Sequence, residues 1–186
     1  WTRVTPLGPD SQPVPVSYGV FTDREMQRPV AFGLTMAEPG RDFCVKVDVE
    51  GLEPDTEYFY RFIARATGGQ TSSPLGRTRT AAPSGTSPQL KLAVISCSNY
   101  PFGLFNVYRE IAKRDDLDAV IHLGDYIYEY GVDGYGGETG RELGRTHDPV
   151  IETVTLEDYR TRHAQYKSDP DLQAAHAAAP WLCTWD

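Results

Sequence analysis

Two short apolar runs, each ending abruptly at side chains that can bind metals, constrain the fold of this chain most strongly. Leu90–Ile95 stops at Ser96-Cys97-Ser98-Asn99, and Ala119–Leu123 stops at Gly124-Asp125. Between them, at residues 105–114, apolar residues recur at helical spacing and cationic residues occupy the other side. The pattern predicts a right-handed strand–helix–strand unit with parallel strands.

The ends of these two strands predict where a site lies. Parallel strands present their carboxyl ends on one edge of the sheet, where open α/β sheets bind ligands. Cys97 and Asp125 follow the two predicted strands, so we expect them to meet in space. Tyr128 follows Asp125 by three residues, and a turn after the strand allows both side chains to reach one cation.

A thiolate, a carboxylate and a phenolate form a metal-binding set with a preference. A phenol has a pKa near 10 and loses its proton to a strongly Lewis-acidic ion such as ferric iron. The Asp125 carboxylate can also bridge to a second, harder cation such as calcium, and paired cations are a common device for clamping phosphate esters. Spacing alone leaves open the alternative that Asp125 only caps a turn.

Residues 1–82 predict a separate β-rich module. Strand-like runs occur at residues 15–21, 30–36, 42–49 and 57–63, with turn signals between them. The alternation Leu52-x-Pro54-x-Thr56-x-Tyr58 resembles a fibronectin type III-like corner, in which a tyrosine ties the corner to the backbone. We therefore expect a small β-sandwich, with any antiparallel sheet carrying alternating aromatics as the alternative.

Residues 83–88 are rich in Pro, Ser and Gly and are interpreted as a linker, which leaves residues 89–186 for the α/β part. The glycine-rich segment 131–154 lacks periodicity and is a candidate lid, in which Arg141, Arg145 and His147 are either solvated or available to an anionic substrate. Helices are expected from Thr155, with a stripe of Leu156, Tyr159, His163 and Tyr166, and from Asp169 to residue 179, followed by a strand at 181–186. His163 is expected to be packed or at the surface, and His176 has no expected role.

Charge and composition limit the classes of function. The net charge is −8 over 186 residues, which disfavours nonspecific nucleic-acid binding and is compatible with a cation site. No stretch reaches the roughly 18 to 20 apolar residues of a membrane helix, and the first residues do not resemble a signal peptide. Three cysteines cannot all pair, and Cys44 and Cys183 are expected to be buried. Oligomeric state and natural substrate have no signature.

Five segments resemble the alkaline phosphatase D (PhoD-like) family of calcineurin-type metallophosphoesterases, and residues 1–82 resemble its N-terminal domain. They are Ser96–Tyr100, His122–Tyr130, Leu156–Arg160, Ala164–Lys167 and Ala175–Trp181.

This resemblance implies a β-sandwich followed by the start of a metallophosphoesterase domain, and hydrolysis of phosphomonoesters and phosphodiesters with ferric iron and calcium. By the same resemblance, Cys97, Asp125 and Tyr128 bind iron, Asp125 bridges to calcium as the central catalytic residue, and Asn99 lies near the site. The family is typically exported, so an extracellular, periplasmic or cell-envelope location is expected.

Asp186 resembles the first residue of the family's Asp-Asp-His-Glu motif, so we expect a chain that carries only the front part of the enzyme and whose own activity is in doubt. Two alternatives remain. One is a noncatalytic binding or adhesion fragment with a scaffold α/β segment. The other is a cysteine hydrolase with Cys97 as nucleophile, which requires a base such as His122.

Overall fold

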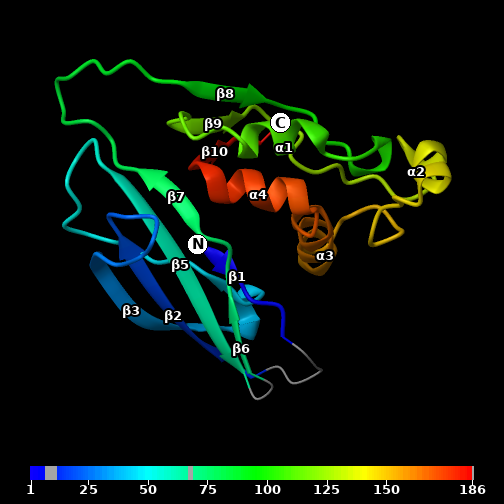
Figure 1. The fold of residues 1–186 in the computed structure, drawn as a ribbon. Coiled ribbons are helices and arrows are strands. Elements are labelled where there is room, and N and C mark those ends of the chain that lie inside the picture. Colours follow the sequence, from blue (N-terminus) through cyan, green and yellow to red (C-terminus); the bar gives the residue numbers. More distant parts are fainter. Residues whose placement is uncertain (7–11, 67–68, 186) are drawn as a thin grey trace. The chain divides into compact units, whose positions relative to one another are not determined.

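The computed structural model describes residues 1–6, 12–66 and 69–185 (Figure 1). The chain divides into two compact units, residues 1–89 and 90–186.

The first unit is built on an antiparallel sheet. Its strand order is β3-β2-β5-β6, and β7 also pairs with β5. A second, two-stranded ribbon joins β1 to β4. The elements are β1 (Thr2–Arg3), β2 (Val14–Phe21), β3 (Pro29–Ala37), the 3-10 helix η1 (Pro39–Arg41), β4 (Cys44–Val45), β5 (Glu57–Ala66), β6 (Gly69–Ser72) and β7 (Gly76–Arg79).

Alternating residues on one face of the sheet form the core of this unit. Val16 pairs with Thr35 of β3 and with Ala64 of β5, and its side chain is fully buried. Val45 of the ribbon belongs to the same buried cluster as Val16 and Phe62. The ribbon therefore covers the apolar face that the alternation creates.

Two predictions for this unit have definite outcomes. The predicted strand 42–49 is wrong outside Cys44–Val45. Asp42 and Phe43 adopt left-handed φ angles of 52° and 53°, so the strand cannot begin before β4, and residues 46–49 are not part of a strand. The predicted tyrosine tie is present: the backbone N–H of Glu53 donates to the hydroxyl of Tyr58 at 2.9 Å. The fibronectin III-like sandwich itself stays a prediction.

The second unit confirms the predicted strand–helix–strand order. Its three-stranded sheet has the order β10-β9-β8, and both strand pairs are parallel. The elements are β8 (Leu92–Ile95), the 3-10 helix η2 (Tyr100–Phe102), α1 (Asn106–Ala112), β9 (Ala119–His122), α2 (Gly137–Leu143), α3 (Leu156–Lys167), α4 (Pro170–Ala178) and β10 (Trp181–Cys183).

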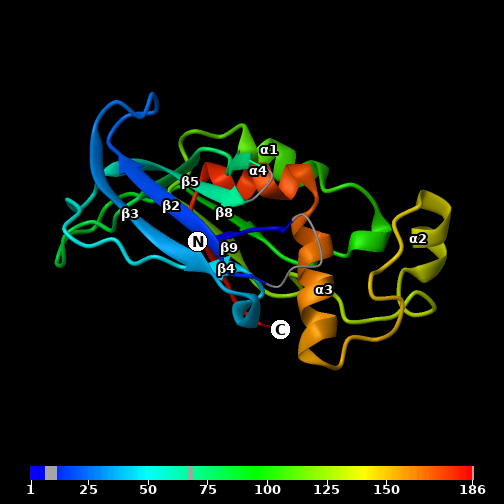
Figure 2. The same cartoon turned by 90° about the horizontal axis from the view of Figure 1, so that it is seen from below.

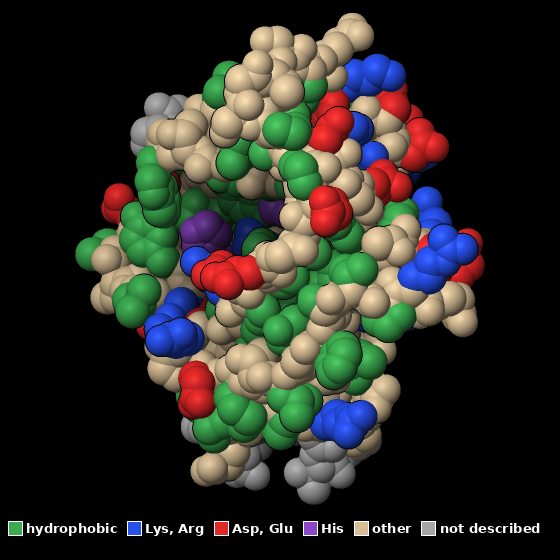
Figure 3. Space-filling view, turned by 90° about the vertical axis from the view of Figure 1, so that its left-hand side faces the viewer, with side chains coloured by type: hydrophobic (Ala, Val, Ile, Leu, Met, Phe, Trp, Pro, Cys, Tyr) green, Lys and Arg blue, Asp and Glu red, His purple; other side chains and the backbone are tan. Residues whose placement is uncertain are grey.

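Helices α1 and α4 lie side by side (Figure 2) and pack with the sheet around Val120, which is fully buried. Ile111 of α1 and Ala175 of α4 complete the centre of this core. Side chains pointing to the other face of the sheet, among them Leu92, Val94 and Leu182, are exposed. Figure 3 shows hydrophobic side chains exposed beside charges of both signs on one face of the molecule.

The two C-terminal helices begin where the sequence predicts. Thr155 and Asp158 form a reciprocal capping box at α3, and the Asp169 carboxylate accepts from the N–H groups of Asp171 and Leu172 at the start of α4. The predicted stripe on α3 is partly wrong, because Leu156 is 66% exposed whereas Arg162 and Tyr166 are fully buried. The expected burial of Cys183 is also wrong, since this residue is exposed.

Helix α2 was not predicted and lies inside the glycine-rich segment 131–154. None of the helices that the structure describes is both long and apolar enough to cross a membrane.

Candidate metal centre

The loops after β8 and β9 are held against each other by backbone hydrogen bonds. The N–H of Cys97 donates to the carbonyl of Gly124 at 3.2 Å, and the N–H of Ser98 donates to the carbonyl of Asp125 at 2.9 Å. The parallel pairing of β8 with β9 places both loops at the same edge of the sheet. The structure therefore brings Cys97 and Asp125 together, as the topology predicts.

Cys97 adopts an unusual backbone conformation. Its φ of 61° lies in the left-handed region that residues other than Gly, Asn and Asp rarely adopt, whereas Asp125, with a φ of 52°, is a residue type that adopts it more readily. For Cys97 such a conformation costs about 1 kcal/mol or more, and it occurs most often at functional sites. The backbone of Cys97, whose thiol contacts Asp125, thus points to a site at these strand ends.

The thiol of Cys97 and the hydroxyl of Tyr128 both contact the same carboxylate oxygen of Asp125. The Cys97 thiol donates to Oδ2 of Asp125 at 3.5 Å, and the Tyr128 hydroxyl donates to the same oxygen at 2.7 Å. Burial, followed by this hydrogen bond to Asp125, raises the pKa of Tyr128 above its ordinary value. Two protons thus point at the carboxylate from a sulfur and a phenol oxygen.

This donor set fits part of a metal site. A cation in place of the two protons would meet a thiolate, a carboxylate and a phenolate, and the two anionic oxygen donors suit a strongly Lewis-acidic ion. Within residues 1–6, 12–66 and 69–185, no three His, Cys, Asp or Glu side chains form a metal-binding group, so the set reaches three donors only through Tyr128. Asp186, the other residue singled out by its motif, lies outside the described residues.

A hollow of about 400 Å³ borders this cluster and is lined by Cys97, Ser98, Asn99, Phe102 and Leu104 among others. Asn99 lies there, as the family resemblance implies. In the described part of the chain, neither amide atom of its buried side chain has a hydrogen-bond partner. An amide with both atoms unsatisfied is costly to bury, which favours a water or ligand beside it.

The hydroxyl of Tyr166 connects the loop after β8 to the loop after β9. It accepts the N–H of Tyr100 at 3.1 Å and the N–H of Tyr128 at 3.3 Å, one from each loop. Its third neighbour is Nε2 of His147, at 3.2 Å. One fully buried side chain on α3 therefore fixes the spacing between the loop after β8 and the loop after β9.

Arg162, one helical turn before Tyr166, holds the second loop by its backbone. Its guanidinium donates to the carbonyls of Asp148 at 3.0 Å, Pro149 at 2.9 Å and Tyr128. The side chain is fully buried, and backbone carbonyls take the role that a carboxylate usually plays for a buried arginine. The backbone of Tyr128 is thus held at its N–H by Tyr166 and at its carbonyl by Arg162.

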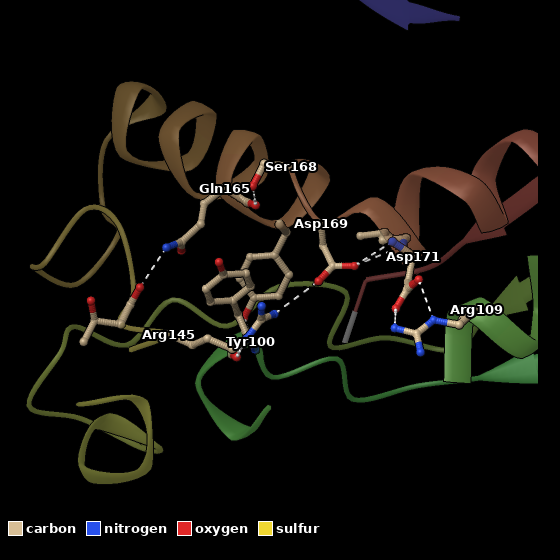
Figure 4. Close-up of polar contacts among 10 residues, drawn as sticks. Tyr100, Arg109, Arg145, Gln165, Ser168, Asp169 and Asp171 are labelled. Carbon is tan, nitrogen blue, oxygen red and sulfur yellow. Dashed lines mark hydrogen bonds and ion pairs between the residues drawn. The ribbon is translucent and has the colours of Figure 1, made fainter. Parts of the chain in front are cut away.

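Arg145 connects the candidate lid, residues 131–154, to Tyr100 and Asp169 (Figure 4). Its guanidinium lies 3.8 Å from the ring centre of Tyr100, donates to the carbonyl of Tyr100 at 3.1 Å and pairs with the Asp169 carboxylate at 3.4 Å. Both side chains of this ion pair are almost completely buried. Segment 131–154 is therefore tied to η2 and to the start of α4.

The other charged residues of this segment also have structural contacts. Arg141 donates to the carbonyl of Val132 at 2.8 Å and pairs with Asp133 at 3.2 Å. His147 is buried, and burial lowers its pKa to about 4. Neither of the two roles predicted from the sequence, solvated charge or substrate contact, describes Arg145 and His147.

The remaining histidines lie within the core of this unit. His163 stacks on the ring of Tyr126, and His176 contacts the Tyr126 hydroxyl at 2.7 Å and stacks on Trp181. Nε2 of His122 lies 3.0 Å from the Ser98 hydroxyl. The cysteine-hydrolase alternative thus loses support, because the ring of its proposed base is directed at Ser98.

Sequence reasoning missed Arg162, and it predicted neither the contacts of Arg145 and His147 nor the link that Tyr166 makes between the two loops. Arg162 and Tyr166 are four residues apart and so share one face of α3. An arginine on the face that also carries Tyr159 and Tyr166 was the available signal, whereas Arg145 and His147 had no periodicity to mark them.

Comparisons with known proteins match this chain to one family. The model of the PhoD-like phosphatase family matches residues 92–186, and the model of the N-terminal domain of PhoD-like phosphatases matches residues 1–82.

Two relatives cover nearly the whole chain. Alkaline phosphatase D of Bacillus subtilis (strain 168) is 45% identical over 192 residues, an alignment that includes 100% of this chain and 32% of the relative. A solved structure of PhoD superposes with a TM-score of 0.85 at 46% identity, over 96% of this chain and 33% of the other. The chain thus spans about a third of the length of these relatives.

Proposed function

Because the chain belongs to the PhoD-like phosphatase family, we propose that the cluster of Cys97, Asp125 and Tyr128 takes part in the hydrolysis of phosphate esters. The observation that carries the proposal is the convergence of a thiol and a phenol on one carboxylate oxygen, at 3.5 and 2.7 Å. A structural cap needs only the carboxylate. The thiol of Cys97 and the phenol of Tyr128 have a use when a cation replaces their protons.

In this proposal Cys97, Asp125 and Tyr128 hold ferric iron, and Asp125 also faces calcium. The cations supply positive charge that stabilises the negative charge developing on the phosphate. The residues of the chain itself position the site: Tyr166 and Arg162 hold the backbone of Tyr128, and the bonds between the strand-end loops hold Cys97 against Asp125. The proposed substrates include both monoesters and diesters. Location outside the cytoplasm stays a prediction from the family.

Replacement of Asp125 by Asn tests this proposal. The amide keeps the shape of the carboxylate but removes the negative charge shared by the two cations, which then repel each other. We expect Asp125→Asn to lose bound metal and to lower kcat on the order of 10³-fold or more. Iron and calcium content is measured by elemental analysis, and turnover with a chromogenic phosphodiester.

A matched control is Asp115→Asn, which changes the same chemical group at an exposed position after α1. We expect this control to retain the metal content and turnover of the parent. If Asp125 only caps a turn, its replacement costs about 1 kcal/mol of stability and leaves turnover intact. Near-parental turnover of Asp125→Asn, or a parent protein that takes up neither cation, would contradict the proposal and favour a noncatalytic fragment.

A further inference from the structure

Four aromatic side chains gather beside the candidate metal centre, and we call them the aromatic patch: Phe102, Tyr128, Tyr130 and Tyr135. The ring centres of Tyr128 and Tyr135 are 6.2 Å apart, those of Tyr130 and Tyr135 5.9 Å, and those of Phe102 and Tyr135 5.0 Å. Phe102 and Tyr130 are each 47% exposed, and Tyr135 is 57% exposed. Aromatic rings in contact with one another are thus also open to a ligand.

The backbone around the patch is fixed by close packing. A Cβ at Gly134 would lie 2.9 Å from Cβ of Tyr130, and a Cβ at Gly137 would lie 2.0 Å from the carbonyl oxygen of Val132. The N–H of Gly134 donates to the carbonyl of Gly131 at 3.0 Å, and the N–H of Gly137 to the carbonyl of Gly134 at 2.9 Å. These contacts place Tyr135 in a compact turn that keeps its ring against Tyr130.

Two members of the patch connect it to the candidate metal centre. The ring of Tyr128 belongs to the patch, while its hydroxyl donates to Asp125 at 2.7 Å. Phe102 packs edge-on against Tyr135 and lines the same hollow as Cys97. If cations at the candidate metal centre hold the phosphate of a substrate, the organic group of that substrate can therefore reach the aromatic patch.

The charges near the patch indicate what kind of group it accepts. Phe102, Tyr130 and Tyr135, the members of the patch outside the proposed ligand set, are uncharged rings. Arg141 is engaged with Val132 and Asp133, and Arg145 is buried against Tyr100 and Asp169. Aromatic faces and edges favour planar, polarisable rings over flexible alkyl chains, because stacked and edge-on pairs add to the gain from apolar burial.

We propose that the aromatic patch is a substrate subsite that binds a planar ring in the organic group of the phosphate ester. This inference rests on the proposed function, since it assumes a phosphate group at Asp125. It assigns the substrate class as phosphate esters of aryl or nucleoside alcohols, and it gives Phe102, Tyr130 and Tyr135 a role in specificity.

The test compares two phosphonates that cannot be hydrolysed, phenylphosphonate and ethylphosphonate, on the full 186-residue chain prepared with iron and calcium. Both carry the same anionic group, and only the first carries a ring. We expect phenylphosphonate to bind about tenfold more tightly by titration calorimetry, as one favourable ring contact predicts.

Variants localise the effect. Tyr135→Ala should bring the ratio of the two Kd values close to one while leaving the Kd of ethylphosphonate unchanged. Tyr135→Phe keeps the ring and should keep the ratio. Phe102→Ala provides a second, independent variant of the patch. Phe32→Ala removes an aromatic side chain that is 81% exposed in the other unit and should change nothing.

Each outcome separates the subsite from the proposed function. Equal Kd values for the two phosphonates in the parent, or a tenfold preference that survives both Tyr135→Ala and Phe102→Ala, overturns the subsite and leaves the proposed function standing. Failure of both phosphonates to bind the metal-loaded parent overturns the proposed function, and the subsite with it.

Discussion

The Tyr166 hydroxyl fixes the protonation of its neighbour His147. Because this oxygen accepts the N–H groups of Tyr100 and Tyr128, its own hydrogen is left to donate to Nε2 of His147. Nδ1 of His147 therefore carries the ring proton and donates to the carbonyl of Tyr130 at 2.8 Å. A proton added at Nε2 would face a hydroxyl whose lone pairs are already used, beside the positive charge of Arg162.

We predict that His147 makes the unit less stable in acid. Burial lowers its folded-state pKa to about 4, below the value near 6.5 of an unfolded chain. The unfolded state then binds more protons between these values, so stability is full above pH ~6.5 and falls as the pH drops to ~4. The expected loss in unfolding free energy is on the order of 3 kcal/mol.

Urea unfolding of the parent and of His147→Gln, measured from pH 4 to pH 7.5, checks this. The variant should be less stable at pH 7.5, where it loses hydrogen bonds, and should show a shallower decline in acid. His176, whose pKa burial lowers to about 3, is present in both proteins and cancels in the comparison. Parallel stability curves for the two proteins would show that His147 does not titrate between the states.

Segment 131–154 is held against the rest of its own unit by side-chain and backbone contacts. Glycines and lack of periodicity predicted a mobile lid, but α2 forms within the segment, and buried contacts fasten it along its length. Arg145 binds it to Tyr100 and Asp169, His147 binds it to Tyr166, and the N–H of Val132 donates to the carbonyl of Val150 at 2.9 Å. The side chains of Arg145 and His147 therefore bind this segment to the rest of its own unit.

Removal of the Arg145 side chain should therefore loosen the segment without unfolding the unit. Arg145→Ala breaks the ion pair and leaves the buried Asp169 carboxylate with only its helix-capping N–H partners, at an expected cost of about 3 kcal/mol. We expect faster amide hydrogen exchange across residues 137–147, measured by mass spectrometry, with little change in β8 and β9. Lys113→Ala, which removes an exposed ion pair with Glu110, serves as the control. Unchanged exchange in residues 137–147 would show that the contacts of Arg145 do not hold this segment in place.

Local patterns in the sequence predict the elements that have regular periodicity, and they miss what depends on distant contacts. The apolar runs at β8 and β9 and the cap at Thr155 are visible in the sequence, and they are enough to bring Cys97 to Asp125. The short β4 is not visible, because alternation at residues 43–49 competes with a turn that puts Phe43 in the left-handed region. The contact of Tyr166 with Tyr100 spans 66 residues, and no local rule connects them.

The whole chain combines two units that have separate cores. In the first, Val14, Val16, Val45 and Phe62 form a cluster under an antiparallel sheet. In the second, Tyr108, Val120, Tyr166 and Leu172 belong to a cluster between helices and a parallel sheet. The predicted metal ligands Cys97, Asp125 and Tyr128 all lie in the second unit. The boundary at residues 89 and 90 lies between the segments matched by the two family models.

The first unit should consequently fold alone and without metal. Residues 1–89 contain the five-stranded sheet, the β1–β4 ribbon and the tie between Tyr58 and Glu53, so the contacts that bury their core are all internal. We expect this fragment to give a cooperative thermal transition by circular dichroism, with a Tm that a chelator does not change, and to have no phosphodiesterase activity. For the intact chain, the same chelator should lower the Tm of the second unit, because a ligand that binds only the folded state stabilises it.

Melting of the 1–89 fragment that depends on the chelator would show that a cation site exists outside the second unit. Failure of the fragment to fold would show that the first unit depends on the second for its stability.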